Sequence, residues 1–289
     1  MDLLDELEAR VLCGDGAMGT LLMAEGVPIE RCFEELCVSE PDRIRGIHEQ
    51  YIGAGARVIE TNTFGANAVR LERFGMEACV AEINRAAVRV AREAAKGKDV
   101  YVAGNVGPLG ISGDEAAARG IDRTQKFREQ LSALLEGGVD AIFFETFMDF
   151  TEMEIALCAK KELSDLPEIC SFACGADGRL SSGLRLMDAF ANLRGQGAQI
   201  LGVNCMNGPN ETTQLLHGLP PGFLLAAYPT AGRHNYRNGH LIYDATPEDF
   251  ARGAREMVAQ GVRLIGGCCG TDATHIAAIA ATLADLPTV

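Results

Sequence analysis

The chain has 289 residues, of which 47% are hydrophobic and 23% are charged, and its formal net charge is −14. This composition is typical of a globular protein, and the acidic total argues against nucleic acid and anionic membranes as partners, because both need clustered Lys and Arg. The sequence has neither the apolar run of roughly 18 residues that a membrane span requires nor the basic start of a secretory signal, so we expect a cytoplasmic protein.

Short apolar runs alternate with helical patterns along the whole chain. The most distinct helical patterns cover residues 41–52, 79–95, 124–136 and 247–259, and strands are expected at 11–15, 57–61, 100–105, 139–145, 169–173, 199–205, 223–228 and 262–268. The strands are continuous hydrophobic runs, as expected for parallel strands covered on both faces. Eight strand–helix units predict one α/β domain, a (β/α)8 TIM barrel over residues 1–289. A doubly wound open sheet is the alternative, but no G-x-G-x-x-G follows a strand.

Polar residues collect where six of these strands end. They are Asp15 after strand 1, Glu60 to Thr63 after strand 2, Asn105 after strand 3, Glu145 and Thr146 after strand 4, Asn204 and Cys205 after strand 6, and Cys268 and Cys269 after strand 8. Any one of them is readily explained as a helix cap or turn residue. Barrel enzymes, however, build their sites at the C-terminal ends of the strands, so the coincidence of six predicts an active site there.

The most specific signal is GGCCGT at residues 266–271. Adjacent side chains of a regular strand point to opposite faces, so Cys268 and Cys269 need a kinked backbone to reach one ion, and the flanking glycines permit it. A vicinal disulfide and two packed core cysteines are the alternatives. Ten cysteines in a long cytoplasmic chain favour core packing, metal binding or catalysis over a disulfide framework.

Cys205 is the expected third ligand, because strand 6 ends near strand 8 around the rim of the barrel. Cys13 and Cys174 also lie near strand ends and are its rivals, although Cys13 is expected to point into the barrel interior. Three thiolates suit zinc, and a fourth coordination position left open is typical of a catalytic site. Such a site favours activation of a substrate thiol, which the metal would deprotonate.

An amino-acid thiol also needs partners for its ammonium and carboxylate groups. Glu145 can take the ammonium, with an N-cap ion pair as the structural alternative for this residue. The backbone amides of the turn at residues 15–19 can take the carboxylate, because small residues let a ligand approach the main chain.

Four motifs resemble the zinc-dependent homocysteine S-methyltransferases, and most closely the homocysteine-binding barrel of cobalamin-dependent methionine synthase. They are GDGAMGT at 14–20, ETNTFGAN at 60–67, GVNC at 202–205 and GCCGT at 267–271, in the family's order. The resemblance implies methionine biosynthesis by methylation of homocysteine. It also implies zinc on Cys205, Cys268 and Cys269, and homocysteine held by a set of residues at the barrel mouth: Asp15, Gly16, Ala17, Met18, Thr61, Glu145 and Asn204.

The methyl donor is expected to be methylcobalamin, with a methyl group derived from methyltetrahydrofolate. No folate- or cobalamin-binding domain follows the last strand, so the donor is expected on a separate corrinoid or folate-binding protein, unless this chain is a module of a larger enzyme. Gly65 and Thr146 stand where the betaine-using branch has tyrosines, which argues against betaine. Thr230 stands where many relatives have Asn. S-methylmethionine as donor and a non-catalytic thiol- or zinc-binding module are the alternatives, and the loops 106–122 and 230–246 are candidate lids or docking surfaces.

Overall fold

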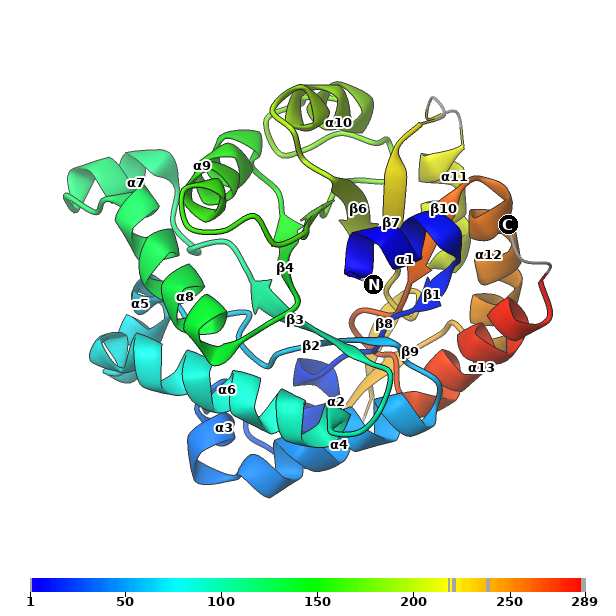
Figure 1. The fold of residues 1–289 in the computed structure, drawn as a ribbon, viewed down its shortest axis with the longest axis horizontal. Helices are drawn as coiled ribbons and strands as arrows, with labels where there is room; N and C mark the ends of the chain where they lie inside the picture. The colour runs from blue at the N-terminus through cyan, green and yellow to red at the C-terminus, as the bar shows by residue number, and fades with distance from the viewer. Residues whose placement is uncertain (1, 218, 220–221, 238–239, 287–289) are drawn as a thin grey trace.

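A computed structural model describes residues 2–217, 219, 222–237 and 240–286. Eight parallel strands form one sheet in the order β1-β10-β7-β6-β5-β4-β3-β2, and a bridge between Gly14 and Val58 joins its two edges (Figure 1). The strands are β1 Leu12–Cys13, β2 Val58–Glu60, β3 Tyr101–Val106, β4 Ala141–Phe147, β5 Glu168–Phe172, β6 Ile200–Asn204, β7 Leu224–Tyr228 and β10 Val262–Ile265. The predicted (β/α)8 barrel is confirmed, and the doubly wound alternative is wrong.

One helix follows each barrel strand and covers the outside of the sheet. These helices are α4 Pro41–Gly53, α6 Val80–Ala95, α8 Arg123–Gly137, α9 Phe150–Lys161, α10 Leu186–Gly195, α11 Pro209–Leu216, α12 Pro247–Ala259 and α13 Ala273–Ala284. The four helices expected from sequence lie within two residues of α4, α6, α8 and α12. None of the helices in the described ranges combines the length and apolarity that crossing a bilayer requires.

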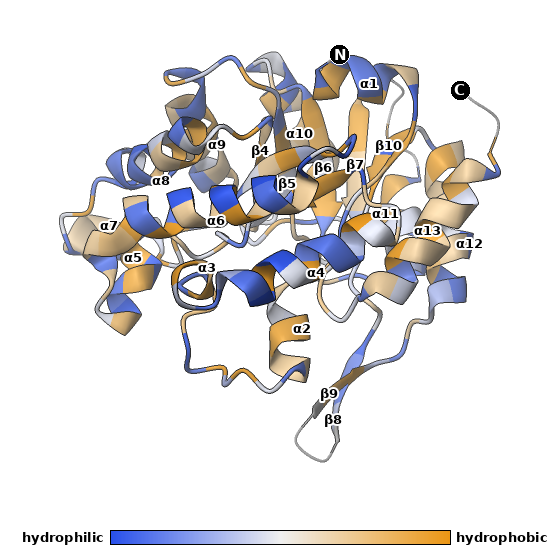
Figure 2. Cartoon of the chain, turned by 60° about the horizontal axis from the view of Figure 1, so that its bottom comes forward, coloured by the Kyte–Doolittle hydropathy of each residue, from blue (hydrophilic) through white to orange (hydrophobic). Residues whose placement is uncertain are grey.

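The structure also contains short helices and strands that the sequence did not indicate. They are α1 Leu3–Ala9, α2 Gly19–Ala24, α3 Leu36–Ser39, α5 Ala68–Leu71, α7 Gly113–Ala118, the 3-10 turns Glu72–Phe74 and Glu77–Cys79, and the antiparallel strands β8 His234–Arg237 and β9 His240–Tyr243. Helix α1 supplies Leu3 and Leu7 to the apolar cluster inside the barrel. The β8–β9 hairpin projects from the same side of the molecule as α2 (Figure 2).

The barrel interior is a packed core with its polar end at the C-terminal side of the strands. Side chains from all eight strands fill it, and the Phe143 and Tyr228 rings meet edge to face with centroids 5.0 Å apart. All three predicted zinc ligands pack against this same cluster. A second, larger cluster fills the layer between the sheet and the surrounding helices. The site therefore stands on the interior core, and rigid strands position it.

The two long loops differ in how they are held. In the 106–122 loop, the Leu109 amide donates to the buried Glu152 carboxylate at 2.8 Å, and Arg70 Nε donates to the Pro108 carbonyl at 2.8 Å. The loop at 230–246 instead contains the β8–β9 hairpin, whose base is clamped by the Arg233 amide donating to Asp244 Oδ1 at 2.6 Å. The first loop is thus tied to the barrel near its start, whereas the second extends beyond it.

Candidate metal and substrate site

The three predicted cysteine ligands meet at the mouth of the barrel. Cys205 Sγ lies 3.9 Å from Cys269 Sγ, Cys268 Sγ lies 4.0 Å from Cys269 Sγ, and all three sulfurs lie within 4.8 Å of one another. Zinc–sulfur bonds of about 2.3 Å in a tetrahedron place two sulfurs about 3.8 Å apart. The trio is therefore spaced to bind a metal ion, and three sulfurs leave one tetrahedral position for another ligand.

Strand β7 brings the two cysteine segments together, because it pairs with β6 on one side and β10 on the other. The Cys205 amide donates to the Tyr228 carbonyl at 3.0 Å, and the Cys268 amide donates to the Pro229 carbonyl at 2.8 Å. The Ala231 amide in turn donates to the Cys269 carbonyl at 2.9 Å. Ligands that are distant in sequence are thus fixed by one intervening backbone segment.

The paired cysteines escape strand alternation because β10 ends at Ile265, before the first of them. This is earlier than the sequence predicted. Gly266 lacks a left-handed φ, so its role is close packing: a Cβ there would lie 2.4 Å from the Tyr228 ring and 2.7 Å from the Asp15 carbonyl oxygen. The turn itself depends on Gly270, whose φ of +82° is costly for other residues.

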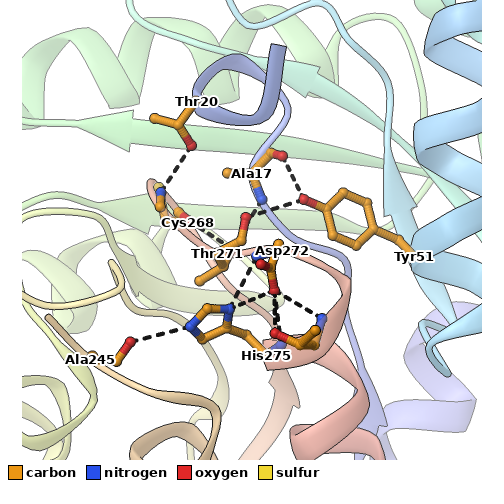
Figure 3. Close-up of polar contacts among 10 residues, drawn as sticks. Ala17, Thr20, Tyr51, Ala245, Cys268, Thr271, Asp272 and His275 are labelled. Atoms are coloured by element: carbon orange, nitrogen blue, oxygen red, sulfur yellow. Dashed lines mark hydrogen bonds and ion pairs between the residues drawn. The ribbon is translucent and has the colours of Figure 1, made fainter. Parts of the chain in front are cut away.

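Thr271 ties the cysteine turn to the turn after β1 (Figure 3). Its hydroxyl donates to the Cys268 carbonyl at 2.7 Å and accepts from the Ala17 amide at 3.1 Å. The Tyr51 hydroxyl of α4 donates to the Ala17 carbonyl at 2.6 Å, and the Thr20 hydroxyl accepts from the Gly270 amide at 2.9 Å. Thr271 and Tyr51 are buried, so this network is shielded from water.

Three residues in the described ranges other than glycine have positive φ, and all belong to the site: Thr146 at 61°, Cys205 at 56° and Met206 at 51°. Such residues persist only where their surroundings enforce them. For Thr146 the enforcing residue is Asn204, which accepts from the Thr146 amide at 3.0 Å and donates to its hydroxyl at 2.6 Å. The local irregularity of β4 between Phe144 and Phe147 also turns Glu145 toward the cysteines.

The cysteines border a cavity of about 450 Å³ that is lined by several acidic side chains. Glu145 Oε1 lies 3.7 Å from Cys268 Sγ, and Asp15 Oδ2 accepts from the Glu60 amide at 2.8 Å. Burial raises the pKa of Glu145 to about 7, and burial together with the Glu145 charge raises the pKa of Asp15. None of the residues lining this cavity, all of them described, is Lys, Arg or His, so the cavity favours a cationic group.

The residues predicted to contact substrate lie around this cavity, with one difference. Asp15, Gly16, Ala17, Met18, Thr61 and Glu145 line it, whereas Asn204 lies behind Glu145 and Thr146 and donates to Glu145 Oε1 at 3.3 Å. The Ala17 amide already donates to Thr271. Glu145 does not cap α9, because Asp149 occupies the N-cap of that helix.

The two rival cysteines lie outside the trio. Cys13 Sγ contacts the Ile276 carbonyl of α13 at 3.8 Å, so it points outward and not, as predicted, into the barrel. Cys174 also packs in the outer cluster between sheet and helices. No described cysteine forms a disulfide, so the vicinal-disulfide alternative is not realised here.

Hydrogen bonds between the thiols distinguish Cys205 from its neighbours. Hydrogen bonds from Cys268 and Cys269 lower the pKa of Cys205 to about 2, and the same contacts raise the pKa of Cys268. One of the three sulfurs is thus stabilised as a thiolate by the other two, which is the form that binds a metal.

Comparison with known proteins decides the family. The model of the family described as homocysteine S-methyltransferase matches residues 12–283. The chain belongs to this family. The resemblance of its motifs predicted this family.

Individual relatives agree in sequence and in fold. Methionine synthase of Mycobacterium tuberculosis (strain ATCC 25618 / H37Rv) is 29% identical over 99% of this chain and 26% of its own length, and methionine synthase of Mycobacterium leprae (strain TN) is 29% identical over 98% and 25%. The chain spans about a quarter of these proteins. The metallated form of the homocysteine methyltransferase MmuM from Escherichia coli is 29% identical, with a TM-score of 0.77 over 96% of this chain and 98% of that chain.

Several residues of the site were not predicted. Tyr51 and Thr271 act on the backbone of the site, and Asn105, although noted at a strand end, bonds to two glutamates. His275 is the N3 partner of the Asp272 cap of α13, and its Nε2 lies 3.2 Å from the Ala245 carbonyl at the base of the hairpin. Thr271 belongs to the GCCGT motif, so the sequence could have indicated its role. The hydrogen-bond partners of Tyr51 and His275, Ala17 and Ala245, are far from them in sequence, so no local pattern indicates these contacts.

Proposed function

We propose that this member of the homocysteine S-methyltransferase family holds zinc on Cys205, Cys268 and Cys269, binds homocysteine in the acidic cavity beside them, and methylates it to methionine. The observation that carries the proposal is the convergence of three sulfurs next to a cavity lined by Asp15 and Glu145. Zinc at this position would lower the pKa of a thiol that occupies the remaining position and keep it nucleophilic.

The residues of the chain would orient the substrate around that point. Asp15 and Glu145 are acceptors for the ammonium group, and Glu145 Oε1 lies 3.7 Å from Cys268 Sγ, so the ammonium site and the sulfur site are adjacent. Homocysteine has two methylene groups between its sulfur and the carbon that bears the ammonium, a separation that such an arrangement can accommodate. Asn204 holds Glu145 and the Thr146 backbone in place, and Thr61 also lines the cavity.

The methyl donor is proposed to approach from a second, larger cavity. This cavity has a volume of about 860 Å³ and is bordered by Cys205, Met206, Tyr243 and Cys269, between the end of β6 and the β8–β9 hairpin. It shares the Cys205–Cys269 edge with the acidic cavity. A donor placed there would have access to the sulfur site without passing the ammonium site.

Methylcobalamin, carried by a corrinoid protein outside this chain, is the proposed donor. The motif at 60–67 and the similarity to methionine synthases, which are about four times as long, support it. S-methylmethionine is the second candidate. The match to nearly the whole MmuM chain favours it, because in that relative the barrel alone makes up a homocysteine methyltransferase.

A donor panel tests the proposal. Zinc-loaded protein is incubated with L-homocysteine and with methylcobalamin, S-methylmethionine or no donor, and methionine is quantified. Methionine with methylcobalamin supports the first donor, and two methionines per turnover without corrinoid support the second. A protein that binds about one zinc and forms no methionine with either donor would contradict a catalytic role. The control is the same panel after removal of zinc by a chelator, which should abolish product with both donors.

A further inference from the structure

Besides Asp15 and Glu145, two further carboxylates line the acidic cavity: Glu34, which accepts from the Gly65 amide at 2.7 Å, and Glu60. Glu60 lines it together with Asp15 and Glu145, at the end of β2. Burial raises the pKa of the Glu60 carboxyl, and the charges of Glu145 and Asp15 raise it further, so the three groups lie close enough to repel one another. No cationic side chain lines the same cavity. The negative charges of Asp15, Glu60 and Glu145 are therefore not balanced by a cationic side chain in the cavity lining.

Asn105 connects two of these carboxylates. Its side-chain amide donates one hydrogen to Glu60 Oε2 and the other to Glu145 Oε2, the latter at 2.8 Å. The Asn105 backbone is fixed as well, because its amide donates to Thr61 Oγ1 at 3.0 Å and its carbonyl accepts from Thr63 Oγ1 at 2.7 Å. Asn105 is buried, so the two glutamates are held at one separation by a group that cannot move easily.

The backbone of Glu60 also forms a hydrogen bond with the carboxylate of Asp15. The Glu60 amide donates to Asp15 Oδ2 at 2.8 Å, while its side chain bonds to Asn105. The backbone of Glu60 thus orients Asp15, and its side chain shares the donor that orients Glu145. Asn105 Oδ1 is buried without a hydrogen-bond partner in the described structure, so the cluster has an unused acceptor as well as excess charge.

These contacts match the chemistry of a primary ammonium group. An ammonium has three N–H donors and one positive charge, and it binds most strongly where ionised acceptors surround it. We propose that Glu60 is a third acceptor for the substrate ammonium and that Asn105 is the positioning residue that holds Glu60 and Glu145 around it. The proposal rests on the proposed function, and it assigns the preference for an amino-acid thiol over a simple thiol to this cluster.

The test separates recognition of the ammonium from general damage to the site. Zinc-loaded wild type, Glu60→Gln and Asn105→Ala are titrated calorimetrically with L-homocysteine and with 4-sulfanylbutanoate, which has the same thiol and carboxylate but no amino group. The glutamine introduced by Glu60→Gln keeps an oxygen for Asn105 but loses the charge. Glu152→Gln is the control, because Glu152 is a buried carboxylate that bonds to Leu109 outside the cavity.

We expect Glu60→Gln to weaken homocysteine binding by about 10- to 100-fold, the usual size of one lost charge-assisted hydrogen bond, and to change 4-sulfanylbutanoate binding by less than about 3-fold. Asn105→Ala should show the same selectivity, and Glu152→Gln should affect neither thiol. Equal losses for the two thiols, or a wild type that binds both equally, would overturn this inference while leaving the proposed function intact. Failure of the zinc-loaded wild type to bind homocysteine would overturn both.

Discussion

Replacing Thr271 by Val tests whether the cysteine turn depends on the turn after β1. The hydroxyl of this buried residue has two partners, the Cys268 carbonyl and the Ala17 amide. The Cys268 carbonyl still accepts a second hydrogen bond, from the Thr271 amide at 3.1 Å. Loss of the bond from the Thr271 hydroxyl therefore costs about 1 kcal/mol. The Ala17 amide is left without an acceptor, which costs about 1–3 kcal/mol for a buried donor. We therefore expect Thr271→Val to lower the free energy of unfolding by about 2–4 kcal/mol.

The same substitution should weaken metal binding. A methyl group cannot lie 2.7 Å from a carbonyl oxygen, so the Cys268 backbone must shift away from the introduced valine. Groups that orient metal ligands typically contribute about 10- to 100-fold to metal affinity, and we expect a zinc affinity lower by that factor. Urea unfolding of the metal-free protein measures the stability term, and competition with a chromogenic chelator measures the zinc term.

Two variants make the result interpretable. Thr271→Ser keeps the hydroxyl and should recover most of both losses. Thr213→Val removes one local hydrogen bond, to the Pro209 carbonyl at 2.9 Å in α11, and should lower stability by about 1 kcal/mol without changing zinc affinity. If Thr271→Val unfolds within about 0.5 kcal/mol of wild type and binds zinc equally well, the reasoning about this residue is refuted.

Three further predictions follow from other parts of the structure. Cys268→Ser should abolish binding of one zinc per chain, measured by atomic absorption, whereas Cys174→Ser should retain it. Asn204→Ala should lower the free energy of unfolding in urea by about 2–3 kcal/mol, because the buried Ser171 hydroxyl and the partly buried Thr146 amide both lose their acceptor. Burial lowers the pKa of His48 to about 4 from its ordinary 6.5, so the unfolded chain binds the extra proton between these values. Stability should fall by up to about 3 kcal/mol as the pH drops through that window, and His48→Leu should flatten the slope; an unchanged slope would contradict the assignment.

The periodic pattern of the sequence was sufficient to predict the barrel, because buried parallel strands must be apolar along their whole length. It placed β6 and β7 within one residue at each end. It extended strand 8 to Cys268, since two glycines and two cysteines are apolar enough to continue the run. In the structure the strand stops at Ile265, and this early end is what lets Cys268 and Cys269 face one point. The segment that forms the β8–β9 hairpin is predicted as a loop, because it is rich in charged and polar residues and its β-prone run is short.

Sequence alone also identified the three cysteines, because side chains at the C-terminal ends of barrel strands must converge. Tertiary structure alone decided how they are held. Hydrogen bonds of Cys205 and Cys268 to the end of β7, of Asn105 to two glutamates, and of Thr271 to Ala17 join residues up to 254 positions apart. Local sequence patterns indicate which side chains prefer burial and which backbone conformations are accessible. They do not indicate which donor bonds to which acceptor far away in the chain, since those pairs form only when the barrel closes.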